Sequence, residues 1–126
     1  MKDMNWIDDN VAVGDYLDKY KVPLTTAIID VRDAFQMESV YSTLFIVQEP
    51  YYFPLPLVHT IAGNIIDHVR RGGKVLIHCT SGIDRAPFVA TVYYMKRYGV
   101  AFDKAYDEVA FKRPQTIQHW DWKEYL

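Results

Sequence analysis

Two kinds of apolar segment alternate along the chain. Short runs rich in apolar and β-branched residues are typical of strands that are covered on both faces; they occupy residues 25–31, 43–47 and 74–78. Longer stretches with apolar residues three and four positions apart predict helices; they span residues 57–71, 87–98 and 103–112. Glycine or proline residues follow each of these stretches, as expected at helix ends.

The two ends of the chain carry weaker signals. Residues 6–13 resemble one or two short extended segments that turn at Asn10, and a short helical pattern follows over residues 14–23. Near the C-terminus, Thr116 is of a residue type that caps helices, so we expect a last helix to begin there.

Strands that alternate with helices in one short chain predict an α/β fold. We expect a single three-layer domain over residues 1–126, with a mainly parallel sheet of about four or five strands and helices on both faces. Open sheets of this kind bind ligands at the carboxyl ends of their strands. The segment that follows the strand at 74–78 is therefore the first candidate for a functional site.

The composition argues against several function classes. Hydrophobic residues make up 50% of the chain, and mixed charges give a net charge of −2 at pH 7, so we expect neither a nucleic-acid partner nor a membrane surface. The absence of a long apolar run and of a leader-like N-terminal pattern predicts a cytoplasmic protein. With one cysteine and four scattered histidines, we expect no disulfide, metal site or cofactor.

The most informative stretch is KVLIHCTSGIDRAP, from Lys74 to Pro87, where a strand leads through a turn into a helix. Cys79 and Arg85 bracket five residues, and such a loop can curl so that successive backbone N–H groups bind one oxyanion. The helix end adds its positive dipole, and the guanidinium of Arg85 can hold two phosphate oxygens. The predicted phosphate-binding residues are Thr80, Ser81, Gly82, Ile83, Asp84 and Arg85.

Cys79 is the candidate nucleophile of this loop. The helix end and the ring of amides favour the thiolate at neutral pH, so its sulfur is placed to attack phosphorus. A lone cysteine beside a buried strand is otherwise an inert small hydrophobe. The spacing of Cys79 with His78, Gly82 and Arg85 favours the catalytic interpretation.

These residues resemble a known signature. HCTSGIDR is similar to the HC-x5-R motif of cysteine-dependent protein tyrosine phosphatases, and the short chain resembles the dual-specificity branch. WIDDNVAVG and DEVAFKRP resemble segments of small archaeal dual-specificity phosphatases, and HCTSG followed by RAPFVA is also similar to plant glucan phosphatases. The resemblance implies hydrolysis in two steps through a cysteinyl phosphate, with His78 orienting the loop and Gly82 permitting its tight bend.

Two departures from the family pattern bear on catalysis. Ala86 stands where most relatives have a hydroxyl residue after the arginine, which predicts a slower second step, with Ser81 or Thr80 as possible substitutes. The Asp that relatives supply as general acid is also absent. Glu49, in a proline-rich loop, is one candidate for this role; Asp84 is the other, because a similar Asp occurs in the loop of myotubularin-type lipid phosphatases. The alternative for Asp84 is a solvent-exposed charge.

The resemblance implies a phosphorylated protein as substrate, with phosphoserine, phosphothreonine and phosphotyrosine all admitted to a shallow pocket. A non-protein phosphomonoester such as a glucan, a lipid or an RNA 5′-phosphate is the alternative, and a weakly active phosphate-binding module is the rival function. Nothing in the sequence indicates the oligomeric state. Four aromatic residues could form a platform for a substrate ring or could belong to the core: Tyr51, Tyr52, Trp120 and Trp122.

Overall fold

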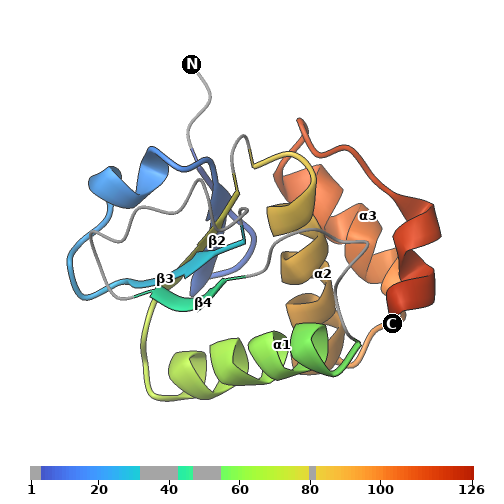
Figure 1. Ribbon diagram of the computed structural model, residues 1–126, viewed down its shortest axis with the longest axis horizontal. Coiled ribbons are helices and arrows are strands. Elements are labelled where there is room, and N and C mark those ends of the chain that lie inside the picture. Colours follow the sequence, from blue (N-terminus) through green and yellow to red (C-terminus); the bar gives the residue numbers. More distant parts are fainter. Residues whose placement is uncertain (1–3, 32–42, 47–54, 80–81) are drawn as a thin grey trace.

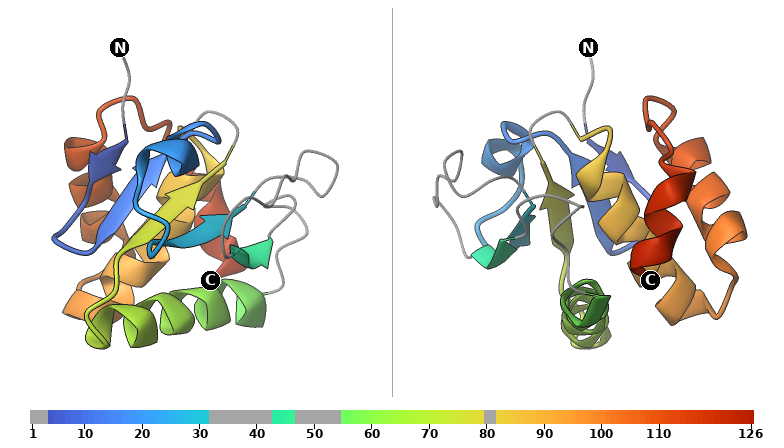
Figure 2. Two further views of the ribbon diagram at one scale, coloured as in Figure 1. Left: turned by 90° about the vertical axis from the view of Figure 1, so that its left-hand side faces the viewer. Right: turned by 45° about the vertical axis from the view of Figure 1, so that its right-hand side comes forward.

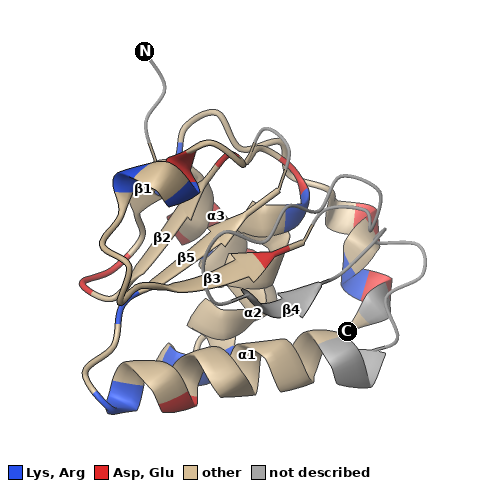
Figure 3. Ribbon diagram, turned by 60° about the vertical axis from the view of Figure 1, so that its left-hand side comes forward, with Lys and Arg blue, Asp and Glu red and all other residues tan. Residues whose placement is uncertain are grey.

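A computed structural model of the chain describes residues 4–31, 43–46, 55–79 and 82–126. Its strands are β1 (Asn5–Trp6), β2 (Val11–Gly14), β3 (Ala27–Asp30), β4 (Thr43–Ile46) and β5 (Val75–His78). They form one sheet in the order β1-β2-β5-β3-β4 (Figure 3). β1 runs antiparallel to β2, and the other neighbouring pairs are parallel. The prediction of an α/β fold with a mainly parallel sheet is therefore confirmed.

The three predicted long helices are present as α1 (Leu55–Arg70), α2 (Arg85–Tyr98) and α3 (Phe102–Lys112). α2 begins two residues earlier than expected, which places Pro87 in its first turn, where a missing N–H costs no helical hydrogen bond. Gly99 ends α2 in the left-handed conformation, as a helix C-terminus favours. Among the described residues, no helix is long and apolar enough to cross a membrane.

Helical cover of the sheet is uneven. In the described part of the chain, α1 and α2 pack against one face, and α3 packs on the outer side of α2 (Figures 1 and 2). The other face is covered by Val22 and the short 3-10 helix η1 (Asp18–Lys21) that precedes it. In the part of the chain that the structure describes, this 3-10 turn is the helical cover of that face.

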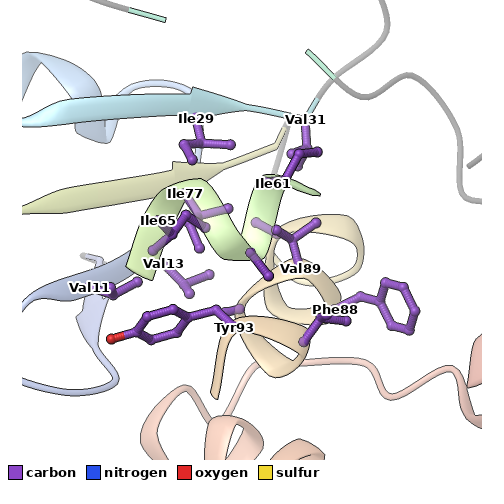
Figure 4. Close-up of a cluster of buried hydrophobic side chains, with 14 of the residues drawn as sticks. Val11, Val13, Ile29, Val31, Ile61, Ile65, Ile77, Phe88, Val89 and Tyr93 are labelled. Carbon is purple, nitrogen blue, oxygen red and sulfur yellow. The ribbon is translucent and has the colours of Figure 1, made fainter. Parts of the chain in front are cut away.

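The main core lies between the sheet and the first two helices (Figure 4). Alternate residues of the central strands point toward the helices, as the two-residue period of a strand requires. Burying each of these side chains stabilises the fold by about 1.5–3 kcal/mol. The labelled members of this cluster are Val11, Val13, Ile29, Val31, Ile61, Ile65, Ile77, Phe88, Val89 and Tyr93.

The C-terminal helix differs from the prediction. It is the 3-10 helix η4 (Trp120–Tyr125), and its N-cap is His119. Thr116 lies before this helix and closes a turn, in which its backbone N–H donates to the carbonyl of Arg113. Packing explains the difference: Trp122 is buried edge-on against Phe88, so aromatic contacts position this segment instead of a capped α-helix.

Asp8 joins the start of the chain to α2. Its carboxylate accepts hydrogen bonds from the hydroxyls of Tyr93 (2.5 Å) and Tyr98 (2.8 Å), from the Arg97 guanidinium (2.9 Å) and from two backbone amides. Burial alone raises the pKa of Asp8, but the bonds from Tyr93, the Asn10 amide and Tyr98 outweigh it and hold this pKa below 3.8. Asp8 therefore stabilises the fold most when it is ionised.

We expect Asp8→Asn to lower the free energy of unfolding by about 1–3 kcal/mol at neutral pH, because buried donors lose a charged acceptor. A carboxyl group with a depressed pKa stabilises the native state above its usual pKa of 3.8 and loses this effect as the pH falls through its folded pKa. Urea unfolding should therefore separate the two proteins at neutral pH and bring them together in acid. The exposed neighbour is the control, since Asp9→Asn should change stability little; an equal loss in both variants would contradict this role.

Candidate functional site

The candidate site lies at the carboxyl edge of the sheet. Gly14, Asp30 and His78 pair side by side as the last residues of their strands, and Cys79 follows directly from β5. Cys79 is only 2% exposed. The backbone N–H of Ala86, in the first turn of α2, donates to its sulfur at 3.4 Å. The thiol thus faces the positive end of a helix, where a thiolate is stabilised.

The loop between β5 and α2 is held from outside by the residues that follow α3. The Gly82 carbonyl accepts a bond from Arg113 Nε at 2.6 Å, and the Ile83 carbonyl accepts one from the Ile117 N–H at 2.8 Å. In a planar trans peptide, a carbonyl and the following N–H point in opposite directions. The N–H groups of Ile83 and Asp84 are therefore directed away from this outer segment, as consecutive amides of an anion-binding nest are.

Arg113 is the main outer support of the loop. It is 1% exposed, and its Nη1 also donates to the Val13 carbonyl at 3.0 Å and to Asn5 Oδ1 at 2.8 Å. Burial lowers the pKa of this guanidinium, whereas the charges of Asp18 and Cys79 raise it. Arg113 therefore ties the loop to β1 and β2 and places a buried positive charge near the thiol.

The tight bend expected at Gly82 is present. Its φ is 70°, in the left-handed region, and an added Cβ would lie 2.4 Å from the Gly14 carbonyl oxygen and 2.6 Å from Arg113 Nη2. Only glycine fits both the backbone conformation and this close approach.

Arg85 and His78 belong to the two elements that adjoin Cys79, the predicted nucleophile. Arg85 is the first residue of α2 and is half-buried. His78 is the last residue of β5, fully buried, with its Nε2 4.0 Å from Oδ2 of the buried Asp30. The sequence indicated His78 as a support of the loop, but it did not indicate that the Asp30 carboxylate is buried beside it.

Asp84 has a partner that the sequence did not indicate. Oδ1 of Asp84 lies 2.5 Å from Nε2 of His119, which is the residue just before η4. The His119 ring stacks on Trp122 with a centroid distance of 3.9 Å, and its backbone N–H donates to the hydroxyl of Tyr106 at 2.9 Å. Asp84 is therefore not simply a solvated charge, although its side chain is 37% exposed.

Several predicted site residues are outside the described part of the chain: Thr80, Ser81, Glu49, Tyr51 and Tyr52. Of the other two aromatic candidates, Trp122 is buried in the core, whereas Trp120 is 43% exposed but packs edge-on against Phe102 and Tyr106. Within the described ranges, no group of three His, Cys, Asp or Glu residues could hold a metal ion.

Comparison with known proteins identifies the family. Residues 56–126, more than half of the chain, match the dual specificity phosphatase catalytic domain. The chain belongs to this family. The matched part of this dual specificity phosphatase domain contains the nucleophile loop, α2, α3 and the C-terminal segment that contacts the loop.

Three relatives illustrate the similarity. The putative tyrosine-protein phosphatase AMV078 of Amsacta moorei entomopoxvirus is 41% identical over 48 residues, which cover 38% of this chain but only 29% of that protein. The structure of Tk-PTP in its active form superimposes with a TM-score of 0.81 at 24% identity, covering 97% of this chain and 92% of that one. The structure of human tyrosine phosphatase-like serine/threonine/tyrosine-interacting protein superimposes with a TM-score of 0.83 at 20% identity, covering 99% of this chain and 93% of that one. The structural matches show a shared fold.

Proposed function

We propose that this dual specificity phosphatase domain hydrolyses phosphomonoesters through a cysteinyl-phosphate intermediate, with phosphotyrosine, phosphoserine and phosphothreonine in proteins as its substrates. One observation carries the proposal: the sulfur of Cys79 accepts an N–H from the first turn of α2, inside a loop whose outward carbonyls are fixed. This arrangement supplies both an activated nucleophile and a preformed oxyanion site.

In the first step, the Cys79 thiolate attacks phosphorus, the S–P bond forms and the bond to the leaving oxygen breaks. Arg85 and the inward N–H groups stabilise the charge on the equatorial oxygens. In the second step, water attacks the cysteinyl phosphate and the thiolate leaves. Ala86 offers only its backbone N–H to the sulfur, without a hydroxyl group, so we infer that the second step is the slower one.

Turnover of p-nitrophenyl phosphate tests the proposal, followed by a panel of phosphopeptides and phosphorylated glucan, lipid and RNA 5′-ends. Hydrolysis of the peptides in preference to the others supports a protein phosphatase. Phosphate binding without turnover would instead show a phosphate-binding module, and preference for a non-protein ester would change the substrate class.

We favour Asp84 over Glu49 as the general acid, because the start of α2 fixes Asp84 beside Arg85. Asp84→Asn should then slow hydrolysis of an alkyl phosphate, a poor leaving group, by about 10²-fold or more, and slow that of p-nitrophenyl phosphate much less. It should also remove the alkaline limb of the pH profile. Glu49→Gln is the matched control and should change neither; the reverse pattern would assign the role to Glu49.

We further propose that residues 1–126 work as one catalytic domain in the cytoplasm. The argument for this location is chemical: a thiolate nucleophile with no second cysteine in the chain needs a reducing compartment to stay active.

A further inference from the structure

The structure assigns to His119 a role in catalysis: it holds Asp84 and exchanges with it the proton that Asp84 delivers to the leaving group. This inference rests on the proposed function. It makes His119 a positioning residue, since it acts through Asp84 rather than on the substrate.

The first support is geometric. Nε2 of His119 and Oδ1 of Asp84 are within hydrogen-bond distance, at 2.5 Å, so a proton can pass between them. The His119 ring cannot turn freely, because it lies parallel to Trp122 at an interplanar angle of 9° and its backbone is tied to Tyr106. The side chain of Asp84 makes no capping bond to its own helix, so His119 supplies its described polar contact.

The second support is electrostatic. A carboxylate beside a bound phosphate dianion is repelled unless it is protonated. A histidine can carry a proton at neutral pH, when an ordinary aspartate cannot. When substrate enters the loop, its negative charge favours transfer of the shared proton from Nε2 of His119 to Oδ1 of Asp84. His119 thus gives Asp84 a proton source.

The proton balance closes over the catalytic cycle. As the S–P bond forms and the ester bond breaks, Asp84 gives its proton to the leaving oxygen, and the pair has then lost one proton. As water attacks the cysteinyl phosphate and the S–P bond breaks, Asp84 accepts a proton from the water and shares it with His119. The His119 side chain is 30% exposed, so the pair can also equilibrate with solvent.

Other titratable groups set the field around the pair. Burial raises the pKa of Tyr106 of α3 to about 12; the bond from the His119 N–H lowers it, and the charges of Asp84 and Asp121 raise it, so Tyr106 stays neutral at working pH. Asp121 of η4 adds a negative charge that favours a proton on the pair, and Arg85 of α2, next to Asp84, opposes it. The pair must retain one proton in this field for the first step.

The test uses His119→Gln, which can still hydrogen bond to Asp84 but cannot carry the proton. With an alkyl phosphate, kcat should fall about 10- to 100-fold, whereas p-nitrophenyl phosphate should show a much smaller loss. The alkaline limb of the pH profile should move to lower pH, because Asp84 then has no histidine from which to take a proton. The double variant Asp84→Asn/His119→Gln should lose no more kcat than the single variant Asp84→Asn, because both changes remove the same proton transfer.

The controls separate this role from a structural one. Gln118→Ala removes the neighbouring side chain, which bonds to Asp107, and should leave the pH profile unchanged. His119→Phe keeps an aromatic ring on Trp122 but loses the bond to Asp84, so it should behave like His119→Gln if the proton matters. An equal loss of kcat with both substrates, or an unshifted pH profile, would overturn the proposed proton relay from His119 to Asp84.

The proposed function itself has a separate readout. If all variants still form the cysteinyl phosphate from p-nitrophenyl phosphate, the chemistry at Cys79 stands whatever the fate of the relay. If Asp84→Asn has no leaving-group effect, the relay is overturned while the phosphatase assignment survives. If wild-type protein forms no cysteinyl phosphate, the proposed function and the relay both fail.

Discussion

Cys79→Ser should abolish hydrolysis, leaving less than about one part in 10⁴ of wild-type turnover with p-nitrophenyl phosphate. A serine hydroxyl is not ionised at neutral pH, so it is a far weaker nucleophile than a thiolate. The amides of Ile83 and Asp84 and the guanidinium of Arg85 are unchanged, so tungstate or vanadate should still bind. Calorimetric titration with tungstate and a turnover assay on the same preparation measure both properties.

The chain offers a clean chemical control for this variant. Cys79 is the only cysteine in the sequence, so labelling by iodoacetate reports on that residue alone. Labelling should inactivate wild-type protein, and bound phosphate should protect it. Turnover that survives in Cys79→Ser would show that another group attacks phosphorus.

Arg113→Lys should cost both stability and activity. The charge remains, but a lysine cannot donate at once to Gly82, Val13 and Asn5, and buried carbonyls left without donors cost about 1–3 kcal/mol each. We expect the free energy of unfolding to fall by about 2–4 kcal/mol. Turnover should also fall about 10-fold or more, because the Gly82 carbonyl is then free to rotate and misdirect the Ile83 amide.

Arg85→Lys is the matched comparison, since the same exchange is made at the arginine that we propose binds the phosphate. We expect a loss of about 100-fold or more in turnover with little change in unfolding by urea. Asn5→Ala removes a single Arg113 partner and should give an intermediate loss of stability. If Arg113→Lys unfolds at the wild-type urea concentration and keeps its turnover, the role of Arg113 as the support of the loop is wrong.

Periodicity was sufficient to locate the helices and strands where each segment packs on a well-defined layer. The runs at 25–31 and 74–78 form central strands buried on both faces, and Gly99 ends α2 as its residue type indicates. The prediction for the C-terminal segment was wrong because Trp122 packs on Phe88, a contact between residues far apart in sequence. Propensity at Thr116 could not anticipate that contact.

In the candidate site, too, local sequence patterns predicted some features, whereas others depend on contacts between residues far apart in sequence. Cys79, Gly82 and Arg85 lie close together in sequence, so their spacing alone predicts an anion-binding loop. Arg113 and His119 contact that loop from beyond α3. Arg113 lies in the DEVAFKRP segment, but that segment did not show that its side chain is buried against the loop, and His119 has no local pattern that distinguishes it from a surface residue. The burial of Arg113 and the pairing of His119 become visible only in the folded structure, where the segment after α3 lies against the loop between β5 and α2.

The existence of the covalent intermediate is the central claim, and it can be measured directly. Wild-type protein is mixed with p-nitrophenyl phosphate, quenched in acid within the first turnovers, and mapped by peptide mass spectrometry. We expect one phosphoryl group on the sulfur of Cys79, accumulating because Ala86 makes the second step slow, and none in Cys79→Ser. Steady turnover of wild-type protein with no phosphate on Cys79, or with phosphate on another residue, would contradict the mechanism.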